Sequence, residues 1–362
     1  MTAAAQTPRH PADVTTAWLS EALGAGGTPV PVAAVEVAPV GTGQTGATYR
    51  VSARYAGDPG GFPNTFVLKL PAADDTVRDR VALGYRSECA FYTSVAPTVR
   101  IPVPHCYHCE STDDGASFAL LLADQSPAIQ GDQIGGCDAA AARLAATALA
   151  GLHGPTWCDP RWPSFPGLAM TQLDPAGAAG MGEIAVMAAD ITVDKLGAKL
   201  DPADRETLRE AMALVTPWAL ARPDRFALIH GDYRLDNMLF APGGDRVTVV
   251  DWQTLGVWLP ARDLAYFTAT SLDPGLRAAI EGDLVSEYHA ALQAHGVTGY
   301  DRETCWQDYR LGAIQAPFIC ALGYAFATGT DRGDEMFVVM LTRGCRAIRE
   351  LGTLELVAEI AD

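Results

Sequence analysis

Two short polar segments, each beside an apolar run, constrain the fold of this chain more than any other feature. HGDYRLDN occupies 230–237 between the runs FALI and MLF, and VVDWQ occupies 249–253. Short apolar runs with polar boundaries are typical of buried strands. Two such strands that pair around a loop would bring Asp232, Asn237 and Asp251 to one edge of a sheet. The sequence therefore predicts that these three side chains act together.

The same three side chains offer the hard oxygen ligands that Mg²⁺ prefers, namely two carboxylates and an amide oxygen. The pattern therefore predicts a magnesium site. The alternative for Asn237 and Asp251 is the ordinary role of such residues in turns.

Lys69 is an isolated cation in the strand-like run FVLKL, where its apolar neighbours leave it in need of an anionic partner. Glu88 lies on the helical segment that follows and can supply that partner, with phosphate oxygens as a second one. The alternative is an ordinary surface pair. Upstream, GTGQTG at 41–46 offers unobstructed backbone N–H groups that suit a phosphate. The alternative for this segment is a plain hairpin turn.

The arrangement of predicted elements favours an α+β fold with two lobes. Strand-like runs dominate up to about residue 125, and helical patterns such as DAAAARLAATALAGLHG dominate after it. We therefore expect a small antiparallel β lobe at 1–125, with a short helix at its start and the hinge at its end. A larger, mainly helical lobe at 126–362 would carry the two polar loops and the acceptor pocket.

The charge balance excludes one class of partner. The net charge of −17 argues against nucleic acid, because phosphate backbones require clustered Lys and Arg. The N-terminus has no apolar core of a signal peptide. The uncharged stretch 311–330 contains Gln315 and Pro317, so we expect a buried helix there and no contact with a membrane. The oligomeric state stays open.

Eight cysteines are scattered along the chain, which is typical of reduced thiols in the cytoplasm rather than a disulfide framework. The segment HCYHC at 105–109 is the one place that suggests a metal. It has no second pair at zinc-site spacing. If the segment is a strand, Cys106 and Cys109 face opposite sides of it, and we therefore expect no metal there.

Taken together, HGDYRLDN, VVDWQ, FVLKL and GTGQTG resemble the protein-kinase-like fold in its small-molecule branch. That branch includes aminoglycoside phosphotransferases, choline kinases and ecdysteroid-kinase-like proteins. The resemblance extends from about residue 35 to residue 345. It implies a kinase that uses ATP and Mg²⁺ to move the γ-phosphoryl group to a hydroxyl of a small molecule.

The resemblance also implies roles for the residues of the two polar loops. Asp232 resembles the catalytic base, and Asn237 and Asp251 resemble the magnesium ligands. Arg234 falls where protein kinases place a lysine near the γ-phosphate, and its guanidinium can neutralise developing charge there. The alternative is that Arg234 pairs with a nearby carboxylate.

Three glycines and an ion pair complete the implied phosphate site. Lys69 resembles the strand lysine that binds the α- and β-phosphates, and Glu88 resembles the helix residue that holds it. Gly41, Gly43 and Gly46 resemble the glycines of a loop that covers the phosphates.

Two further segments match the family by position. FALLLADQ at 118–125 resembles the strand and hinge that bind adenine, through the C=O of Ala123 and the N–H of Gln125. Asp263 resembles a helix aspartate that braces the catalytic loop through backbone N–H groups. His230 resembles the structural residue that opens that loop.

Two other function classes compete with a small-molecule kinase. A protein kinase needs a long segment after the metal aspartate as a peptide platform, whereas only twelve positions separate Asp251 from Asp263. A catalytically inactive nucleotide-binding module would usually lack the base or a metal ligand, and this chain keeps Lys69, Asp232 and Asn237 as well.

The acceptor is left open between an aminosugar, a choline-like compound and a steroid-like or other alcohol. A cationic acceptor can use the acidic residues in TDRGDEM at 330–336. An apolar alcohol can use aromatic side chains of the helical lobe, although core packing is the simpler expectation for most of them. This aromatic set comprises Trp258, Tyr266, Trp306, Tyr309 and Phe318.

Overall fold

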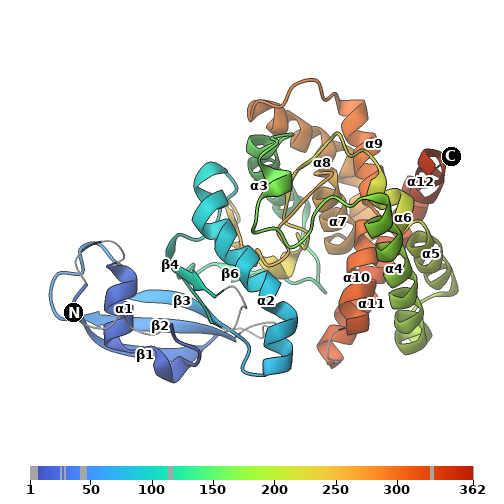
Figure 1. Cartoon of the computed structure of the whole chain (residues 1–362). Coiled ribbons are helices and arrows are strands. Elements are labelled where there is room, and N and C mark those ends of the chain that lie inside the picture. Colours follow the sequence, from blue (N-terminus) through green and yellow to red (C-terminus); the bar gives the residue numbers. More distant parts are fainter. Residues whose placement is uncertain are drawn as a thin grey trace. The chain divides into compact units, whose positions relative to one another are not determined.

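A computed structural model of the chain describes residues 7–24, 27, 30–40, 47–112, 117–326 and 330–361. The chain forms two compact units, shown in sequence colours in Figure 1. The first unit comprises residues 1–98, 103–127 and 250–255, and the second comprises 99–102, 128–249 and 256–362. The predicted lobe boundary between residues 125 and 126 stays a prediction. Residues 99–102 belong to the second unit and residues 250–255 to the first, so the two units are not separated by a single point in the chain.

The first unit is built on an antiparallel sheet of five strands in the order β1-β2-β3-β5-β4. All five coincide with strand-like runs in the sequence. Their bounds are β1 (Val32–Pro39), β2 (Ala47–Tyr55), β3 (Thr65–Leu70), β4 (Cys106–Ser111) and β5 (Phe118–Ala123). The predicted β-rich N-terminal part is thus confirmed.

One helix lies against each face of this sheet. Helix α1 (Thr16–Leu23) buries Trp18 against inward side chains such as Leu68. Helix α2 (Asp75–Ala90) covers the other face, where Tyr85 stacks on Phe118 with the ring centroids 4.6 Å apart. Successive residues of a strand alternate between the two faces, so each strand of this sheet contributes to both layers.

The same alternation decides where the strand lysine points. Lys69 lies opposite Leu120 in the β3–β5 register, and Leu120 is two residues from Phe118 on the same face. Lys69 therefore faces α2 and the buried side of that helix. The polar group sits inside an apolar layer because the strand period, rather than its polarity, fixes its direction.

The second unit consists mainly of helices, with two small sheets in the orders β6-β8-β9 and β10-β7. The strands are β6 (Ile129–Gln130), β7 (Ala227–Ile229), β8 (Met238–Phe240), β9 (Val247–Val249) and β10 (Gly256–Trp258). The helices are α3 (Ala139–Thr156), α4 (Pro175–Leu196), α5 (Pro202–Ala213), α6 (Val215–Leu220), α7 (Ala261–Ser271), α8 (Pro274–Ala294), α9 (Arg302–Gly312), α10 (Gln315–Phe326), α11 (Asp331–Leu351) and α12 (Thr353–Ala361).

These sheets place the first polar segment in a defined loop. Residues 230–237 connect β7 to β8, and their last three form a short 3-10 turn, Leu235–Asn237. Helix α7 follows later in the chain, contacts this loop, and is buried along its whole length. A buried helix against a short loop is a rigid support for polar groups.

One helix among the described residues is long and apolar enough, by length and composition alone, to cross a membrane. It runs from Pro175 to Lys199 and includes α4. A core helix of a soluble protein passes the same test, and α4 packs against α5, α6 and α10. The uncharged stretch 311–330 contains α10, most of whose described residues are buried, as expected for a core helix.

Close packing of α9 on α7 generates a stability prediction. A Cβ atom on Gly312 would lie 2.9 Å from the Cα of Arg262 and 3.0 Å from the carbonyl oxygen of Ala261. We expect Gly312→Ala to lower the free energy of unfolding by about 1–3 kcal/mol, because backbone has to move to admit the methyl group. Urea denaturation measures this change.

Gly282 provides the matched control. It lies inside α8, and a Cβ there would meet nothing within 4 Å. Gly282→Ala should raise the free energy of unfolding by about 0.5–1 kcal/mol through helix propensity. Equal effects of the two substitutions would show that α9 does not depend on the missing side chain at 312.

Candidate active site

The loop at 230–237 is fixed through its backbone by one buried carboxylate. Asp263, in the first turn of α7, accepts the N–H of His230 at 2.6 Å and the N–H of Gly231 at 2.9 Å. His153 lies 3.4 Å from the same carboxylate and also contacts the hydroxyl of Tyr288. The contacts of Asp263 with backbone N–H groups are those that the family resemblance implies, and His230 and His153 are both fully buried.

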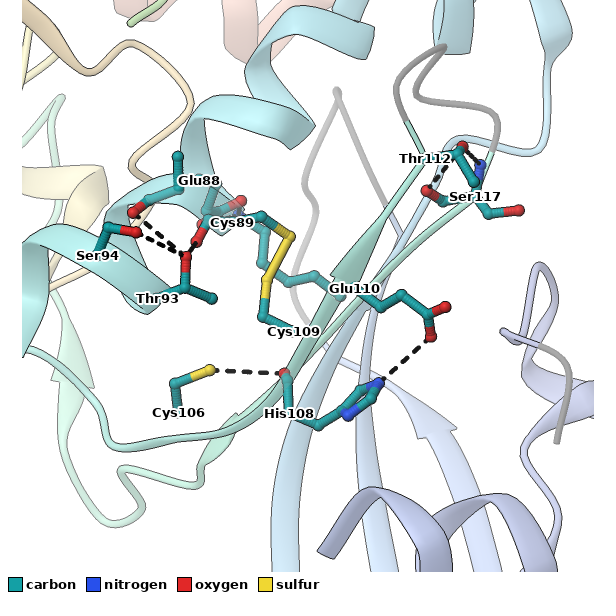
Figure 2. Close-up of a disulfide and its surroundings, with 12 residues drawn as sticks. Glu88, Cys89, Thr93, Ser94, Cys106, His108, Cys109, Glu110, Thr112 and Ser117 are labelled. Atoms are coloured by element: carbon teal, nitrogen blue, oxygen red, sulfur yellow. Dashed lines mark hydrogen bonds and ion pairs between the residues drawn. A yellow bond between two sulfur atoms is a disulfide. The ribbon is translucent and has the colours of Figure 1, made fainter. Parts of the chain in front are cut away.

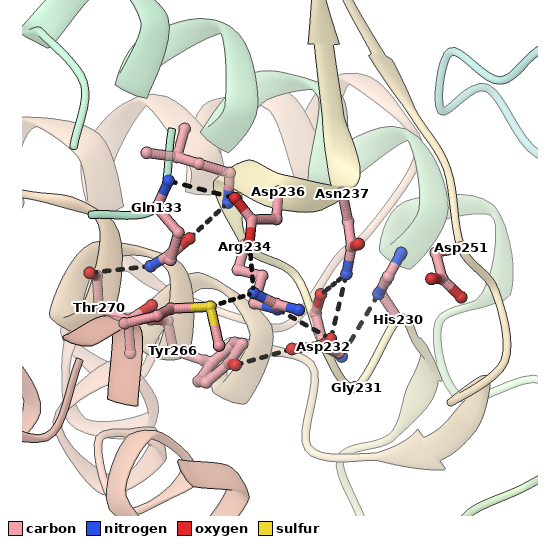
Figure 3. Close-up of polar contacts among 12 residues, drawn as sticks. Gln133, His230, Gly231, Asp232, Arg234, Asp236, Asn237, Asp251, Tyr266 and Thr270 are labelled. Carbon is pink, nitrogen blue, oxygen red and sulfur yellow. Dashed lines mark hydrogen bonds and ion pairs between the residues drawn. The ribbon is translucent and has the colours of Figure 1, made fainter. Parts of the chain in front are cut away.

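The carboxylate of Asp232 is held by three donors, which Figure 3 shows converging on it. The hydroxyl of Tyr266 donates to Oδ1 at 2.7 Å. On the other oxygen, Oδ2 accepts Nε of Arg234 at 3.0 Å and the amide nitrogen of Asn237 at 3.1 Å. Both oxygens are engaged, so the plane of the carboxylate is defined.

These contacts decide the charge of Asp232. Burial alone would raise the pKa of its carboxyl, but the positive charge of Arg234 and the hydrogen bond from Tyr266 outweigh burial. The pKa is therefore lowered from its usual value, and the group is ionised at neutral pH. An ionised carboxylate at this position can accept a proton from a hydroxyl.

Arg234 is paired with carboxylates on both sides. Beyond its contact with Asp232, its Nη1 lies 3.0 Å from Oδ2 of Asp236 and 3.2 Å from the sulfur of Met336. Arg332 also reaches Asp236, at 3.4 Å. The structure thus shows the pairing that the sequence left open as the simpler alternative for Arg234, and a role near the γ-phosphate stays a prediction.

Asn237 uses its amide nitrogen within the loop. That nitrogen donates to the backbone carbonyl of Asp232 at 2.8 Å in addition to the side-chain contact described above. The amide oxygen is consequently the atom that a cation would bind. Among the described residues, no group of three or more His, Cys, Asp or Glu side chains is placed to hold a metal ion.

The loop is also anchored by two glutamines that sequence reasoning overlooked. Gln133 accepts the N–H of Leu235 at 2.8 Å, and Gln315 donates to the carbonyl of Gly231 at 3.1 Å. Both side chains are fully buried. Neither residue lies near the loop in sequence, so no local pattern indicates the contact.

In the first unit, Lys69 and Glu88 form the predicted ion pair. Nζ lies 2.7 Å from both carboxylate oxygens of Glu88 and 3.7 Å from Oδ1 of Asp251. Burial by itself would lower the pKa of Lys69, but the charges of Asp251 and Glu88 outweigh it and the pKa is raised. Lys69 is therefore a fixed cation between two carboxylates.

Asp251 has an unusual backbone as well as an ionic partner. Its φ is +69°, in the left-handed region that few residues other than glycine adopt. Its side chain is 37% exposed, whereas that of Glu88 is fully buried. Next to it, Trp252 stacks on Phe91 with the ring centroids 3.5 Å apart. The buried tryptophan anchors a strained residue whose carboxylate remains accessible.

The predicted hinge segment, 118–125, comprises β5 and the two residues that follow it. The carbonyl of Ala123 accepts the side-chain amide of Gln125 at 3.2 Å, and the N–H of Ala123 donates to His105 at 2.8 Å. A carbonyl has a second lone pair, so adenine binding by Ala123 and Gln125 stays a prediction. Gly41, Gly43 and Gly46 lie outside the described residues.

The expectation that all the cysteines are reduced is wrong for one pair. Cys89 on α2 and Cys109 on β4 form a disulfide, shown in Figure 2, with the Cα atoms 5.8 Å apart. The other cysteines are free thiols. The pairing is invisible in the sequence because it depends on how α2 lies across the edge strand.

A β-bulge explains why the pairing escaped the strand pattern. The register of β4 shifts between Cys106 and His108, so that Cys106 lies opposite Leu122 and Cys109 lies opposite Leu120. Leu120 and Leu122 are two residues apart and share a face. Cys106 and Cys109 therefore also share a face, the one covered by α2, and the prediction that they point to opposite sides is wrong.

Most of the aromatic set turns out to be core. Trp258, Tyr309 and Phe318 are no more than 2% exposed, and the ring of Trp306 stacks on Tyr309. The expectation of core packing is confirmed for Trp258, Tyr309 and Phe318, whereas Trp306 is half-buried and Tyr266 contacts Asp232 in the site.

Comparison with known proteins now decides the family. A sequence profile described as the phosphotransferase enzyme family matches residues 36–304. The chain belongs to this family.

Two solved structures show the same fold. A Plasmodium vivax ethanolamine kinase aligns with a TM-score of 0.54 and 12% identity, over 88% of this chain and 83% of that one. A Ralstonia eutropha protein assigned as an aminoglycoside phosphotransferase aligns with a TM-score of 0.50 and 17% identity, over 92% and 97%. The predicted two-lobed, kinase-like α+β fold of this phosphotransferase is thereby confirmed.

A curated relative matches over a short stretch. Acyl-CoA dehydrogenase family member 11 of Gallus gallus is 50% identical over 46 residues, which are 12% of this phosphotransferase and 6% of that protein. The chain therefore spans a small part of the curated relative it matches.

The disulfide generates a prediction about stability. It closes a loop between positions 20 apart in sequence. By loop-closure entropy, Cys109→Ser should lower the free energy of unfolding by about 3 kcal/mol. Urea denaturation under non-reducing conditions measures the loss, and Cys158→Ser, at an exposed free cysteine, is the control that should change little.

The free thiols generate a prediction about reactivity. Burial raises the pKa of Cys106 to about 11 and that of Cys137 to about 12. At pH 8 the thiolate fraction of Cys106 is then roughly two hundredfold below that of an ordinary thiol. We expect iodoacetamide to modify Cys158 first in the folded protein, as followed by peptide mass spectrometry. Rapid alkylation of Cys106 would contradict this.

Proposed function

We propose that this protein is an ATP-dependent kinase that transfers the γ-phosphoryl group to a hydroxyl of a small molecule. The observation that carries the proposal is the carboxylate of Asp232, which is ionised, fixed at both oxygens and mounted on a braced loop in a member of a phosphotransferase family. Asp232 orients the acceptor hydroxyl and takes its proton as the phosphoryl group departs from ATP.

The proposed cofactors are ATP and Mg²⁺, and the residues present suit them. The amide oxygen of Asn237 and the accessible carboxylate of Asp251 are hard donors for Mg²⁺. A magnesium ion, when bound, neutralises charge on the phosphate oxygens. Lys69, held by Glu88, would bind the α- and β-phosphates.

Other parts of the nucleotide site rest on the family resemblance. The backbone of Ala123 and Gln125 would bind adenine, and Gly41, Gly43 and Gly46 would cover the phosphates. Arg234 would turn from its carboxylate partners towards the γ-phosphate. We place the reaction in the cytoplasm, where ATP is available, without nucleic acid or membrane partners.

Two alternatives are weighed by the structure of the chain after Asp251. Between Asp251 and Asp263 the chain forms β10 and enters α7, which leaves no long segment for a peptide platform. A protein kinase is therefore disfavoured. An inactive nucleotide-binding module of the same fold remains the second candidate, and retention of Asp232, Asn237 and Lys69 argues against it.

The contacts of two carboxylates in the helical unit bear on the class of acceptor. Asp334, in the acidic stretch that a cationic aminosugar would use, is paired with Lys199 at 3.1 Å. Asp236 is likewise paired with Arg234 and Arg332. Because Asp334 and Asp236 already have cationic partners, we favour an uncharged alcohol, in line with the ecdysteroid-kinase-like resemblance, over a polycationic acceptor or a choline-like one.

Removal of the base is the direct test. Asp232→Asn should lower kcat by about 10²–10⁴-fold, because the amide cannot take the proton. ATP consumption is measured with a library of neutral and cationic hydroxyl compounds. Asp245→Asn, on an exposed loop, serves as the control and should retain full activity. An inactive nucleotide-binding module would consume no ATP as the wild type or as either variant.

The metal ligands are tested by binding. In thermal-shift titrations, Mg²⁺ should strengthen the effect of ATP on the wild-type protein. Asn237→Ala and Asp251→Ala should each abolish most of that magnesium-dependent gain, which is measured relative to the same variant without ligand because both substitutions also remove contacts of the free protein. An undiminished gain in both variants would exclude these residues as ligands.

A further inference from the structure

We infer that Tyr266 is a positioning residue that fixes the carboxylate of Asp232 for phosphoryl transfer. The inference rests on the proposed function, because it assigns a partner to the proposed base. The hydroxyl of Tyr266 lies 2.7 Å from Oδ1 of Asp232, and Tyr266 is fully buried.

Tyr266 lies on the same helix as Asp263, the residue that holds the backbone of the loop. It lies three residues after Asp263 on α7, so the two side chains share one face of the helix. Asp263 holds the backbone of the loop, and Tyr266 holds the carboxylate that the loop presents. One buried helix thus fixes both the main chain and the reactive side chain.

The other two donors to Asp232 are of a different kind. Arg234 and Asn237 both belong to the same loop as Asp232 and both bind Oδ2. They move with the loop, and each has a second task in the proposed site. Tyr266 is the contact to Oδ1 that comes from outside the loop, so it sets the rotation of the carboxylate relative to the helical scaffold.

The tyrosine is suited to act as a donor. Burial and the neighbouring carboxylate of Asp232 raise its pKa well above the usual value, so the hydroxyl keeps its proton. The hydroxyl of Tyr266 therefore donates a hydrogen bond to Asp232 and does not act as a base towards the substrate. A carboxylate has further lone pairs, which leaves Asp232 able to accept a hydrogen bond from an acceptor hydroxyl.

Loss of the hydroxyl should affect turnover rather than nucleotide binding. A hydrogen bond to a charged group that orients a reacting atom corresponds to roughly a 10- to 100-fold effect on rate. We expect Tyr266→Phe to lower kcat by about that factor, with the KM for ATP unchanged. The ring that fills the core is retained, so the fold should persist.

Tyr309→Phe is the matched control. Tyr309 is also buried, and its hydroxyl contacts Thr268 of α7 at 2.8 Å and Glu281 at 2.8 Å. The substitution weakens the support of the same helix without touching Asp232. It should lower stability while kcat stays within about twofold. Equal losses of kcat in the two variants would overturn the inference, because they would indicate a general effect on α7.

A double-mutant cycle tests the contact without any activity. Urea unfolding is measured for Tyr266→Phe in the wild type and in an Asp232→Ala background. If the hydroxyl bonds to Asp232, the second substitution removes its partner and the two effects are not additive. Additive effects would overturn the inference.

The outcomes separate this inference from the proposed function. A wild-type protein that consumes ATP while Tyr266→Phe keeps the wild-type kcat overturns the positioning role alone. A wild-type protein that consumes no ATP with any acceptor overturns the proposed function and the positioning role together, even where the cycle confirms the contact.

Discussion

The hydrogen bonds from the N–H groups of His230 and Gly231 to the carboxylate of Asp263 determine the shape of the loop on which the candidate site depends. A buried carboxylate requires such donors in place of water, and these two backbone N–H groups supply them. The carboxylate of Asp263 accepts the two backbone N–H groups, and these groups in turn stabilise its charge. Because Asp263 belongs to a helix buried along its length, the loop inherits the rigidity of the helical core, and short contacts such as that of Tyr266 can then orient single atoms.

Two cations near the candidate site are each paired with two carboxylates of the same unit. In the first unit, one cation lies between two carboxylates, Glu88 and Asp251. In the second, Arg234 lies between Asp232 and Asp236. This pairing offsets part of the cost of removing these charged groups from water. The phosphates of a nucleotide would therefore compete with these carboxylates for the two cations.

Much of the fold could be predicted from the sequence because it follows from patterns of neighbouring residues. Period-two alternation gives β2 and β3, and the isolated cation of FVLKL indicates the pair with Glu88. The features that escaped depend on tertiary geometry. One extra residue in β4 rotates Cys106 relative to Cys109, and the disulfide depends on where α2 crosses that strand. Tyr266 was visible only as one aromatic residue among several, although its spacing of three from Asp263 was a signal for a shared helical face.

The left-handed backbone at Asp251 restricts what evolution or design can place there. Among residues with a side-chain oxygen, aspartate and asparagine tolerate this conformation best, whereas β-branched threonine is excluded and longer glutamate is penalised. A substitution that conserves charge is thus not conservative at this position. Glycine would relieve the torsional cost and leave no oxygen, so local stability and ligand chemistry select for opposite residues at a single site.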